Sequence, residues 1–215
     1  MSPIIIKPKT VAQVCSVSRT AIGMVTAVVD QTGWAIGDRI QIGFIESVRC
    51  ILLKRIESDD GFRLSYSNAR KQTGGRVECR SFMTNYLQTI VELPKKNIVP
   101  VFLKNTDWTM ALMLEEIEWE KTDFSKTGVN TVSRDLLGVY ELLGKGDAVL
   151  RIGEGKIKDR INAHLADKRF APPTVKSFRY VGVNSTDDTK ILEQIRIEEF
   201  ERETGILPRF QEIRA

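Results

Sequence analysis

Residues 138–153 read GVYELLGKGDAVLRIG, and this stretch decides the fold of the C-terminal part of the chain. Two largely apolar runs, 138–143 and 148–153, flank the glycine-rich segment GKGD at 144–147. Glycine readily adopts the positive φ angles that tight turns between antiparallel strands require. The stretch therefore predicts a β-hairpin.

An amphipathic helix is predicted directly after the hairpin, over residues 156–168. Isoleucine or leucine recurs every fourth residue between positions 157 and 165, which is the spacing of one helical face. Arg160 and His164 are one turn apart, at the edge of this apolar stripe. A hairpin that leads into such a helix would bring Tyr140, an arginine and a histidine into one neighbourhood.

The order of these elements resembles the GIY-YIG nuclease family. That family has Gly-Ile-Tyr on one strand, Tyr-Ile-Gly on the next, a helix with Arg and often His, a Glu on a second helix and a closing Pro-x-x-Asn. The corresponding segments here, over roughly residues 134–215, are Gly138-Val139-Tyr140, Arg151-Ile152-Gly153 and Pro208-Arg209-Phe210-Gln211, with Arg160 and His164 on the helix. Two positions depart from the family pattern, since Arg151 replaces a tyrosine and Gln211 replaces the asparagine.

The resemblance implies an α/β domain with a three-stranded antiparallel sheet flanked by helices. Residues 175–183 alternate and are the predicted third strand. A long helix is expected over about 189–204, because residues 185–188 form an N-cap cluster and Gly205 ends the periodic segment.

The family's chemistry is metal-dependent phosphodiester hydrolysis. By resemblance, Arg160 would clamp the phosphate, since its planar guanidinium can hold two oxygens. Tyr140 would deprotonate or position the attacking water, although a half-buried strand aromatic is the plainer interpretation. Arg151 would either lower the pKa of Tyr140 or mark a damaged site.

The remaining site predictions concern leaving-group assistance, phosphate contact and the metal. His164 would donate to the leaving oxygen or orient a phosphate, although a structural role is also open. Glu193 is the predicted ligand of Mg²⁺ or Mn²⁺, with Glu199 in reserve. Further substrate contacts are predicted for Lys156, Lys158 and Gln211.

The chain has 215 residues, enough for two domains. We predict a β-rich domain over 1–121, a polar linker over 122–133 and the nuclease-like domain over 134–215. No apolar run is long enough to cross a bilayer, so a cytoplasmic location is expected. The three cysteines, Cys15, Cys50 and Cys79, share no CxxC spacing and are expected in the core rather than in disulfides or zinc sites.

Positive charge is concentrated in two segments. Eight Lys or Arg accompany four acids between residues 49 and 80, and nine accompany four between 145 and 179. Residues 108–126, in contrast, carry five acids and two lysines. The basic segments suit contact with a phosphate backbone, and a solvated surface of mixed charge is the alternative.

The N-terminal half is predicted to be mainly strands. A helix is expected over 19–31, followed by strands over 39–45, 48–56, 62–66, 76–82 and 88–93, while 108–120 fits a strand or a helix. The segment 33–38, Gly-Trp-x-x-Gly-Asp, weakly resembles swapped-hairpin DNA-binding regulators, which are dimers. Arg70 and Lys71 lie in a polar loop, 67–75, that is either a nucleic-acid contact or a solvated hairpin tip.

The sequence predicts an α+β protein without a membrane association, and the GIY-YIG resemblance implies an endonuclease that acts on double-stranded DNA. The resemblance of the N-terminal half to dimeric regulators implies a homodimer, and the small size favours a restriction-type enzyme. Two alternatives remain open. One is a non-catalytic DNA-binding or regulatory protein with a nuclease fold, and the other is an adaptor that binds another protein.

Overall fold

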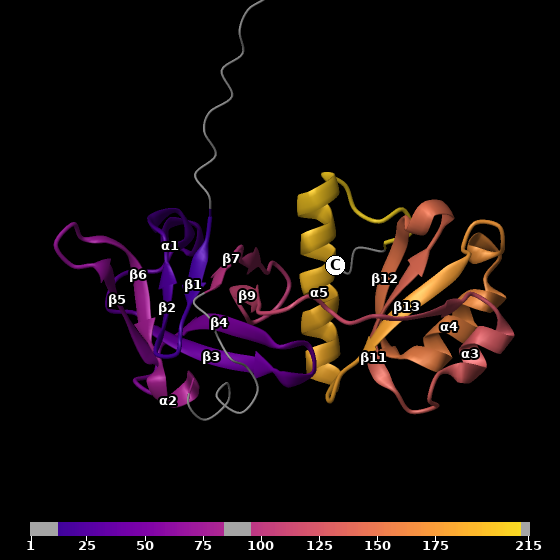
Figure 1. Ribbon diagram of the computed structural model, residues 1–215, viewed down its shortest axis with the longest axis horizontal. Helices are drawn as coiled ribbons and strands as arrows, with labels where there is room; N and C mark the ends of the chain where they lie inside the picture. Colours follow the sequence, from indigo (N-terminus) through magenta and orange to yellow (C-terminus); the bar gives the residue numbers. More distant parts are fainter. Residues whose placement is uncertain (1–12, 84–95, 212–215) are drawn as a thin grey trace, which may run out of the picture. The chain divides into compact units, whose positions relative to one another are not determined.

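The computed structural model describes residues 13–83 and 96–211. The protein has an α+β fold, as the sequence predicts, with a nine-stranded antiparallel sheet followed by a four-stranded antiparallel sheet and its helices (Figure 1). The strand predicted over 88–93 lies outside the described residues.

Contacts divide the chain into two compact units. The first comprises residues 1–42 and 54–100, and the second comprises 43–53 and 101–215. The second unit therefore contains the whole segment that resembles a nuclease, together with residues 101–133.

The nine-stranded sheet has the order β7-β1-β2-β6-β5-β3-β4-β9-β8. Its strands are β1 (Cys15–Val17), β2 (Ala21–Met24), β3 (Arg39–Ile45), β4 (Cys50–Ile56), β5 (Phe62–Asn68), β6 (Thr73–Glu78), β7 (Lys96–Ile98), β8 (Val101–Phe102) and β9 (Met110–Met113). Between them lie the short helices α1 (Thr26–Thr32), η1 (Glu46–Val48) and α2 (Arg80–Phe82).

Several sequence predictions change in this sheet. The strand expected over 76–82 is wrong at its end, since β6 covers Thr73–Glu78 and residues 80–82 form α2. The helix expected over 19–31 is shortened to α1, because residues 21–24 form β2 and pair with both β1 and β6. Strand pairing on both sides satisfies the backbone groups of these residues, which outweighs a weak helical pattern. The ambiguous segment 108–120 contains β9, which pairs with β4 and β8.

The second sheet has the order β10-β13-β11-β12. Its strands are β10 (Glu120–Asp123), β11 (Leu137–Leu143), β12 (Val149–Lys156) and β13 (Ser177–Gly182), and its helices are α3 (Lys126–Thr131), η3 (Lys145–Asp147), α4 (Ile157–Ala166), η4 (Lys168–Phe170) and α5 (Thr186–Thr204). The predicted hairpin is confirmed as β11–β12. The prediction of three strands is wrong, since β10 adds a fourth by pairing with β13. The expected linker, 122–133, holds the end of β10 and helix α3.

Helices cover both faces of this second sheet (Figure 1). On one face Tyr140 and Leu142 of β11 pack with Ile157 and Ile161 of α4. On the other face Val139 and Ile152 pack with Leu192 and Ile195 of α5. The alternation of side chains along β11 therefore separates two cores.

The predicted burial of the three cysteines is confirmed. Cys15, Cys50 and Cys79 are buried free thiols. Burial raises the pKa of Cys15 and of Cys79 to about 12, so neither thiol ionises near pH 7.

A buried carboxylate fastens α5 to the sheet. The side chain of Glu141, on β11, has no exposed surface and accepts hydrogen bonds from Nε of Arg179 at 2.7 Å and Nε of Arg196 at 3.0 Å. The two guanidinium groups also lie over the ring of Trp119, at 4.8 and 5.6 Å from its centroid. The positive charges of Arg179, on β13, and Arg196, on α5, thus compensate the buried negative charge of Glu141.

Removal of this carboxylate is predicted to destabilise the fold. Glu141→Ala leaves Arg179 and Arg196 without their buried counter-ion, so we expect the free energy of unfolding to fall by about 3–5 kcal/mol. Denaturant unfolding followed by circular dichroism measures this loss. The exposed Glu203→Ala, on the same helix α5, is the control and should change stability by less than about 0.5 kcal/mol. Equal stabilities of the two variants would contradict the role of Glu141.

Candidate functional site

The site is built on the close approach of Tyr140 to Gly153. These residues are direct partners in the β11–β12 pairing. A Cβ atom at position 153 would overlap the phenol ring and hydroxyl of Tyr140. Glycine is therefore required at position 153 for the tyrosine to lie flat across the neighbouring strand.

Helix α4 carries His164, whose side chain lies beside Tyr140. Its buried residues Ile157 and Ile161 fix the helix against the sheet. The Tyr140 hydroxyl lies 2.7 Å from Nε2 of His164. The ring of Phe170 contacts His164 edge-on, at 4.6 Å between centroids, and restricts rotation of the imidazole. The spatial grouping of Tyr140 with the histidine, expected from sequence, is present.

Two guanidinium groups complete the cluster. Arg151 of β12 and Arg160 of α4 both act on Tyr140 through hydrogen bonds and charge, and both act on His164 through charge. The Nε atom of Arg160 is buried and has no hydrogen-bond partner within the part of the chain that the structure describes. We refer to Tyr140, Arg151, Arg160 and His164 as the arginine–tyrosine cluster.

Arg151 lowers the pKa of Tyr140, as the sequence predicts, but it does not determine the direction of the overall shift. Burial is the largest effect and raises the pKa of Tyr140 above its ordinary value, while the charges of Arg160 and Arg151 offset it only in part. The tyrosine has no exposed surface and is protonated at neutral pH. It is therefore better suited to hold the histidine than to remove a proton from water.

His164 is neutral at physiological pH. Burial, followed by the positive charges of Arg151 and Arg160, lowers its pKa to about 4. When the protonated tyrosine donates its hydrogen to Nε2, the neutral imidazole carries its own proton on Nδ1. That N–H is a hydrogen-bond donor beside two cations, a combination that suits an anionic oxygen.

Arg151 and Gln211, the two positions that differ from the GIY-YIG pattern, both join strand β12 to the segment after α5. Arg151 donates to the carbonyl oxygen of Phe210 at 2.7 Å, and the side-chain oxygen of Gln211 accepts from the backbone N–H of Ile152 at 3.0 Å. The Phe210 N–H also donates to the Leu150 carbonyl at 2.8 Å. Arg151 and Gln211 therefore fix the C-terminal segment along β12.

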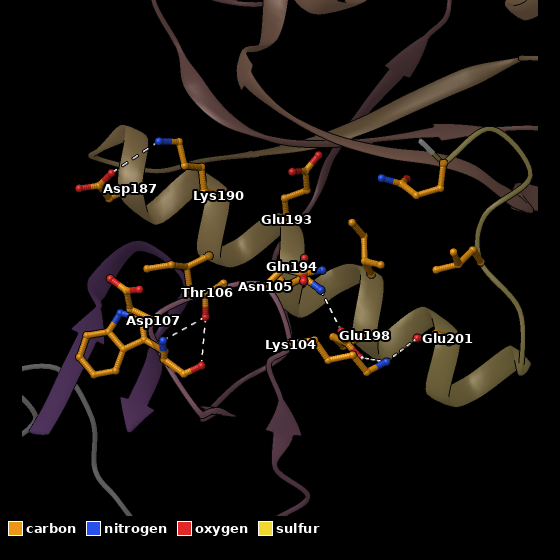
Figure 2. Close-up of a pocket in the computed structure, with 15 residues that line it drawn as sticks. Lys104, Asn105, Thr106, Asp107, Asp187, Lys190, Glu193, Gln194, Glu198 and Glu201 are labelled. Atoms are coloured by element: carbon orange, nitrogen blue, oxygen red, sulfur yellow. Dashed lines mark hydrogen bonds and ion pairs between the residues drawn. The ribbon is translucent and has the colours of Figure 1, made fainter. Parts of the chain in front are cut away.

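Glu193, the predicted metal ligand, has a different setting. It lies on α5, and its side chain is only 8% exposed. It lines a cavity of about 710 Å³ to which Gln194 and Gln211 also contribute (Figure 2). Because Gln211 also binds Ile152, the cavity and the arginine–tyrosine cluster both adjoin strand β12. Glu199, the reserve ligand, is paired with Arg196.

Lys156 and Lys158, which are predicted to contact the substrate, lie at the start of helix α4. Arg70 and Lys71, which are predicted to contact it from a loop, belong to the first unit. Lys156 forms an ion pair with Asp135 at 3.1 Å, and Lys158 donates to the Val132 carbonyl at 3.3 Å. Arg70 and Lys71 are exposed at the turn between β5 and β6. Neither Lys156 nor Lys158 is among the charged groups that act on Tyr140 or His164.

Sequence reasoning missed Phe170 and Glu141. Phe170 follows α4 in a short helical turn that precedes two prolines, and nothing in its local pattern indicates a contact with His164. Glu141 does carry a signal, since it is a charged residue inside an apolar strand sequence. Such a residue is either exposed or paired, and it is paired here.

The donor groups fit a loosely held Mg²⁺ and do not form an all-protein cage. Among residues 13–83 and 96–211, no group of three His, Cys, Asp or Glu side chains could hold a metal. Mg²⁺ often binds one or two carboxylates and takes its other ligands from water and substrate phosphates. Glu193, nearly buried in a cavity with other carboxylates, fits this arrangement.

Comparison with known proteins found no matching family model, no matching curated protein and no matching solved structure. Within the described residues, no helix is long and apolar enough to cross a membrane. The functional case therefore depends on the residues themselves.

The low pKa of His164 gives a direct prediction. Because it is the only histidine, its NMR signals can be followed through a pH titration, and we expect a midpoint of about 4. Arg160→Ala removes one of the charges that lower this pKa, so the midpoint should rise. Arg134→Ala, an exposed arginine outside the cluster, is the matched control and should leave it unchanged.

The lowered pKa of His164 also makes the folding stability of the protein depend on pH. Between pH 4 and about 6.5 the unfolded histidine binds more protons than the folded one, so stability rises with pH across this window. The stabilising effect is complete above about 6.5 and is lost as the pH falls toward 4. A midpoint near 6.5 in the folded protein would contradict the described environment of His164.

Proposed function

We propose that the second unit is a Mg²⁺-dependent nucleic-acid phosphodiesterase similar to the GIY-YIG nucleases, and that the whole chain is a DNA endonuclease of restriction type. The convergence of Tyr140, Arg151, Arg160 and His164 carries this proposal. These residues come from two strands and one helix. Tyr140, Arg160 and His164 match the family pattern in order, whereas Arg151 stands where that pattern has a tyrosine.

Each member of the cluster has a role consistent with its environment. Arg160 holds a phosphate oxygen, and its buried Nε gains an acceptor when it does so. His164 donates its Nδ1 hydrogen to a phosphate or leaving oxygen. Tyr140 positions His164 through the 2.7 Å hydrogen bond. Arg151 adds positive charge and holds the C-terminal segment.

Glu193 and Gln211 are the residues that would hold the metal. A bound Mg²⁺ supplies charge neutralisation at the phosphate and acidifies a water molecule. Gln211 joins this part of the site to the cluster, because its side chain lines the cavity of Glu193 and accepts from Ile152.

Plasmid cleavage tests the proposal. The purified chain, incubated with supercoiled DNA, should produce nicked or linear forms with Mg²⁺ and none with EDTA. Arg160→Ala removes the phosphate clamp and should lower the rate about 10²- to 10³-fold, which is typical for the loss of one transition-state donor. Glu193→Gln should also abolish cleavage, whereas Arg134→Ala should cleave at the wild-type rate.

Two results would count against this enzyme. One is cleavage that is insensitive to EDTA. The other is full activity in a folded Arg160→Ala variant, which would show that the activity belongs elsewhere or to a contaminant.

We further propose that the β5–β6 hairpin of the first unit contacts the DNA backbone. Arg70 and Lys71 are exposed at its turn, with the backbone N–H of Lys71 donating to Asn68 Oδ1 at 3.1 Å. A side chain that binds a phosphate releases a counterion and increases the salt dependence of binding.

The salt dependence of binding tests this contact. Binding of duplex DNA in EDTA should weaken as salt rises, and the double variant Arg70→Ala/Lys71→Ala should lower the slope of log K against log salt by about two. Fluorescence anisotropy measures both slopes. Arg134→Ala is again the control. An unchanged slope in the double variant would indicate a solvated hairpin tip.

A non-catalytic DNA-binding protein is the second candidate, and specific observations favour it. Tyr140 has no exposed surface, and the residues at the two altered positions, Arg151 and Gln211, fix the C-terminal segment. Metal-independent duplex binding without cleavage would select this candidate over the nuclease.

A further inference from the structure

The hairpin of β5 and β6 extends beyond the sheet to which it belongs. β5 pairs with β3 at Phe62 and Arg63, and β6 pairs with β2 over residues 75–78. Residues 65–73 continue past both pairings, and each of them is exposed (Figure 1). Both faces of this segment, which we call the β-ribbon, are therefore open to a partner.

Side-chain hydrogen bonds help to hold the β-ribbon in shape. The Ser65 hydroxyl donates to the Arg76 carbonyl oxygen at 3.1 Å. The Ser67 hydroxyl donates to the carbonyl oxygen of Thr73 at 2.9 Å. A two-stranded hairpin on its own is at best marginally stable in water, so these bonds add to the strand pairing that reaches Thr73. The β-ribbon thus has a defined shape although its side chains are exposed.

The composition of the hairpin favours a nucleic acid over a protein as this partner. Residues 65–77, SYSNARKQTGGRV, contain three Lys or Arg and no Asp or Glu. Apart from Tyr66, the exposed residues 65–73 include no large hydrophobic side chain. Protein interfaces usually have an apolar centre, whereas DNA contacts use positive charge and hydrogen-bonding side chains.

Gln72, at the turn of the β-ribbon, has an unusual backbone conformation. Its φ angle is 50°, in the left-handed region that glycine adopts readily and glutamine adopts at a cost. Its side chain is exposed. Such costs are concentrated at ligand-binding positions. We therefore looked for a function of the Gln72 amide.

We propose that the β-ribbon enters the major groove of double-stranded DNA and that Gln72 reads an adenine there. This groove is about 12 Å wide and admits a two-stranded ribbon, whose strands lie about 5 Å apart. The glutamine amide donates to N7 of adenine and accepts from its N6 amino group. The inference rests on the proposed DNA contact of the hairpin, in which Arg70 and Lys71 bind phosphates, and not on the phosphodiesterase chemistry.

Selection of duplexes followed by atomic substitution tests the reading of an adenine. The full chain, in EDTA to prevent cleavage, is used to select duplexes from a library with a randomised centre. Fluorescence anisotropy should show that the selected duplex binds at least tenfold more tightly than a shuffled duplex of the same composition. Adenines of the selected duplex are then replaced one at a time by 7-deazaadenine, which pairs normally but lacks the N7 acceptor. One of these replacements should weaken binding by about tenfold.

Variants assign this effect to Gln72. Gln72→Gly relieves the backbone cost, so the midpoint of denaturant unfolding should stay the same or rise. The same variant should bind the natural and the 7-deazaadenine duplex equally. Gln41→Ala, which removes an exposed glutamine from β3 in the same unit, is the control and should discriminate between them as the wild-type protein does.

Several results would overturn the inference. They are the selection of no preferred sequence, a 7-deazaadenine effect that is the same in Gln72→Gly and the wild type, and equal affinity for duplex RNA, whose major groove is too deep and narrow for side chains to read. Absence of plasmid cleavage with the 7-deazaadenine effect retained would overturn only the nuclease. Cleavage without any such effect would overturn only the reading by Gln72.

Discussion

The hydrogen bond between Tyr140 and His164 is the constraint on which the candidate site depends. It joins a central strand to the helix that follows the hairpin, and it spans 24 residues of sequence. Three other features make it possible. Gly153 gives the phenol ring room to cross the next strand, Ile157 and Ile161 fix the helix, and Phe170 limits the rotation of the imidazole.

Because the hydroxyl and the imidazole are held in this way, the two guanidinium groups act on one defined position. The cluster is thus organised by packing before any ligand binds, and preorganised donors of this kind are the ones that contribute most to anion binding.

Strand β11 divides the second unit into two chemically different sides. Tyr140 faces α4, where arginines gather, and its neighbour Glu141 faces α5 and binds two arginines. The α5 side also has the acidic cavity with Glu193. Positive groups around a buried tyrosine suit an anion, and the carboxylates of the cavity suit the metal of the proposed nuclease. Gln211 adjoins both, since it lines the cavity and binds the edge of β12. The C-terminal segment therefore adjoins both the cluster and the cavity.

Burial changes the chemical interpretation of the motif residues. A tyrosine beside arginines suggests an activated phenol, but the loss of solvent around Tyr140 outweighs both charges and keeps it protonated. The same burial and the same charges lower the pKa of His164 to about 4 and keep it neutral. The pair is therefore a hydrogen bond between two neutral side chains. Arg151 and Gln211, which depart from the family pattern, support the chain after α5. Arg151 therefore has two contacts on this part of the chain, because it also lowers the pKa of Tyr140 through charge and a hydrogen bond.

Local patterns in the sequence were enough to predict the β11–β12 hairpin, helix α4 and the end of α5 at Gly205, because turn chemistry and helical periodicity determine these features. The contact between Tyr140 and His164 was also predictable, because the two residues are close in sequence. Tertiary structure alone decided the rest. Residues 21–24 became a strand, β10 joined the second sheet, and residues 108–120 yielded β9, since each gains backbone partners from distant segments. The protonation of Tyr140 and His164 and the acidic cavity also depend on which distant side chains exclude water around them. A sequence pattern gives the order of chemical groups along the chain, whereas desolvation and charge at a site depend on three-dimensional packing.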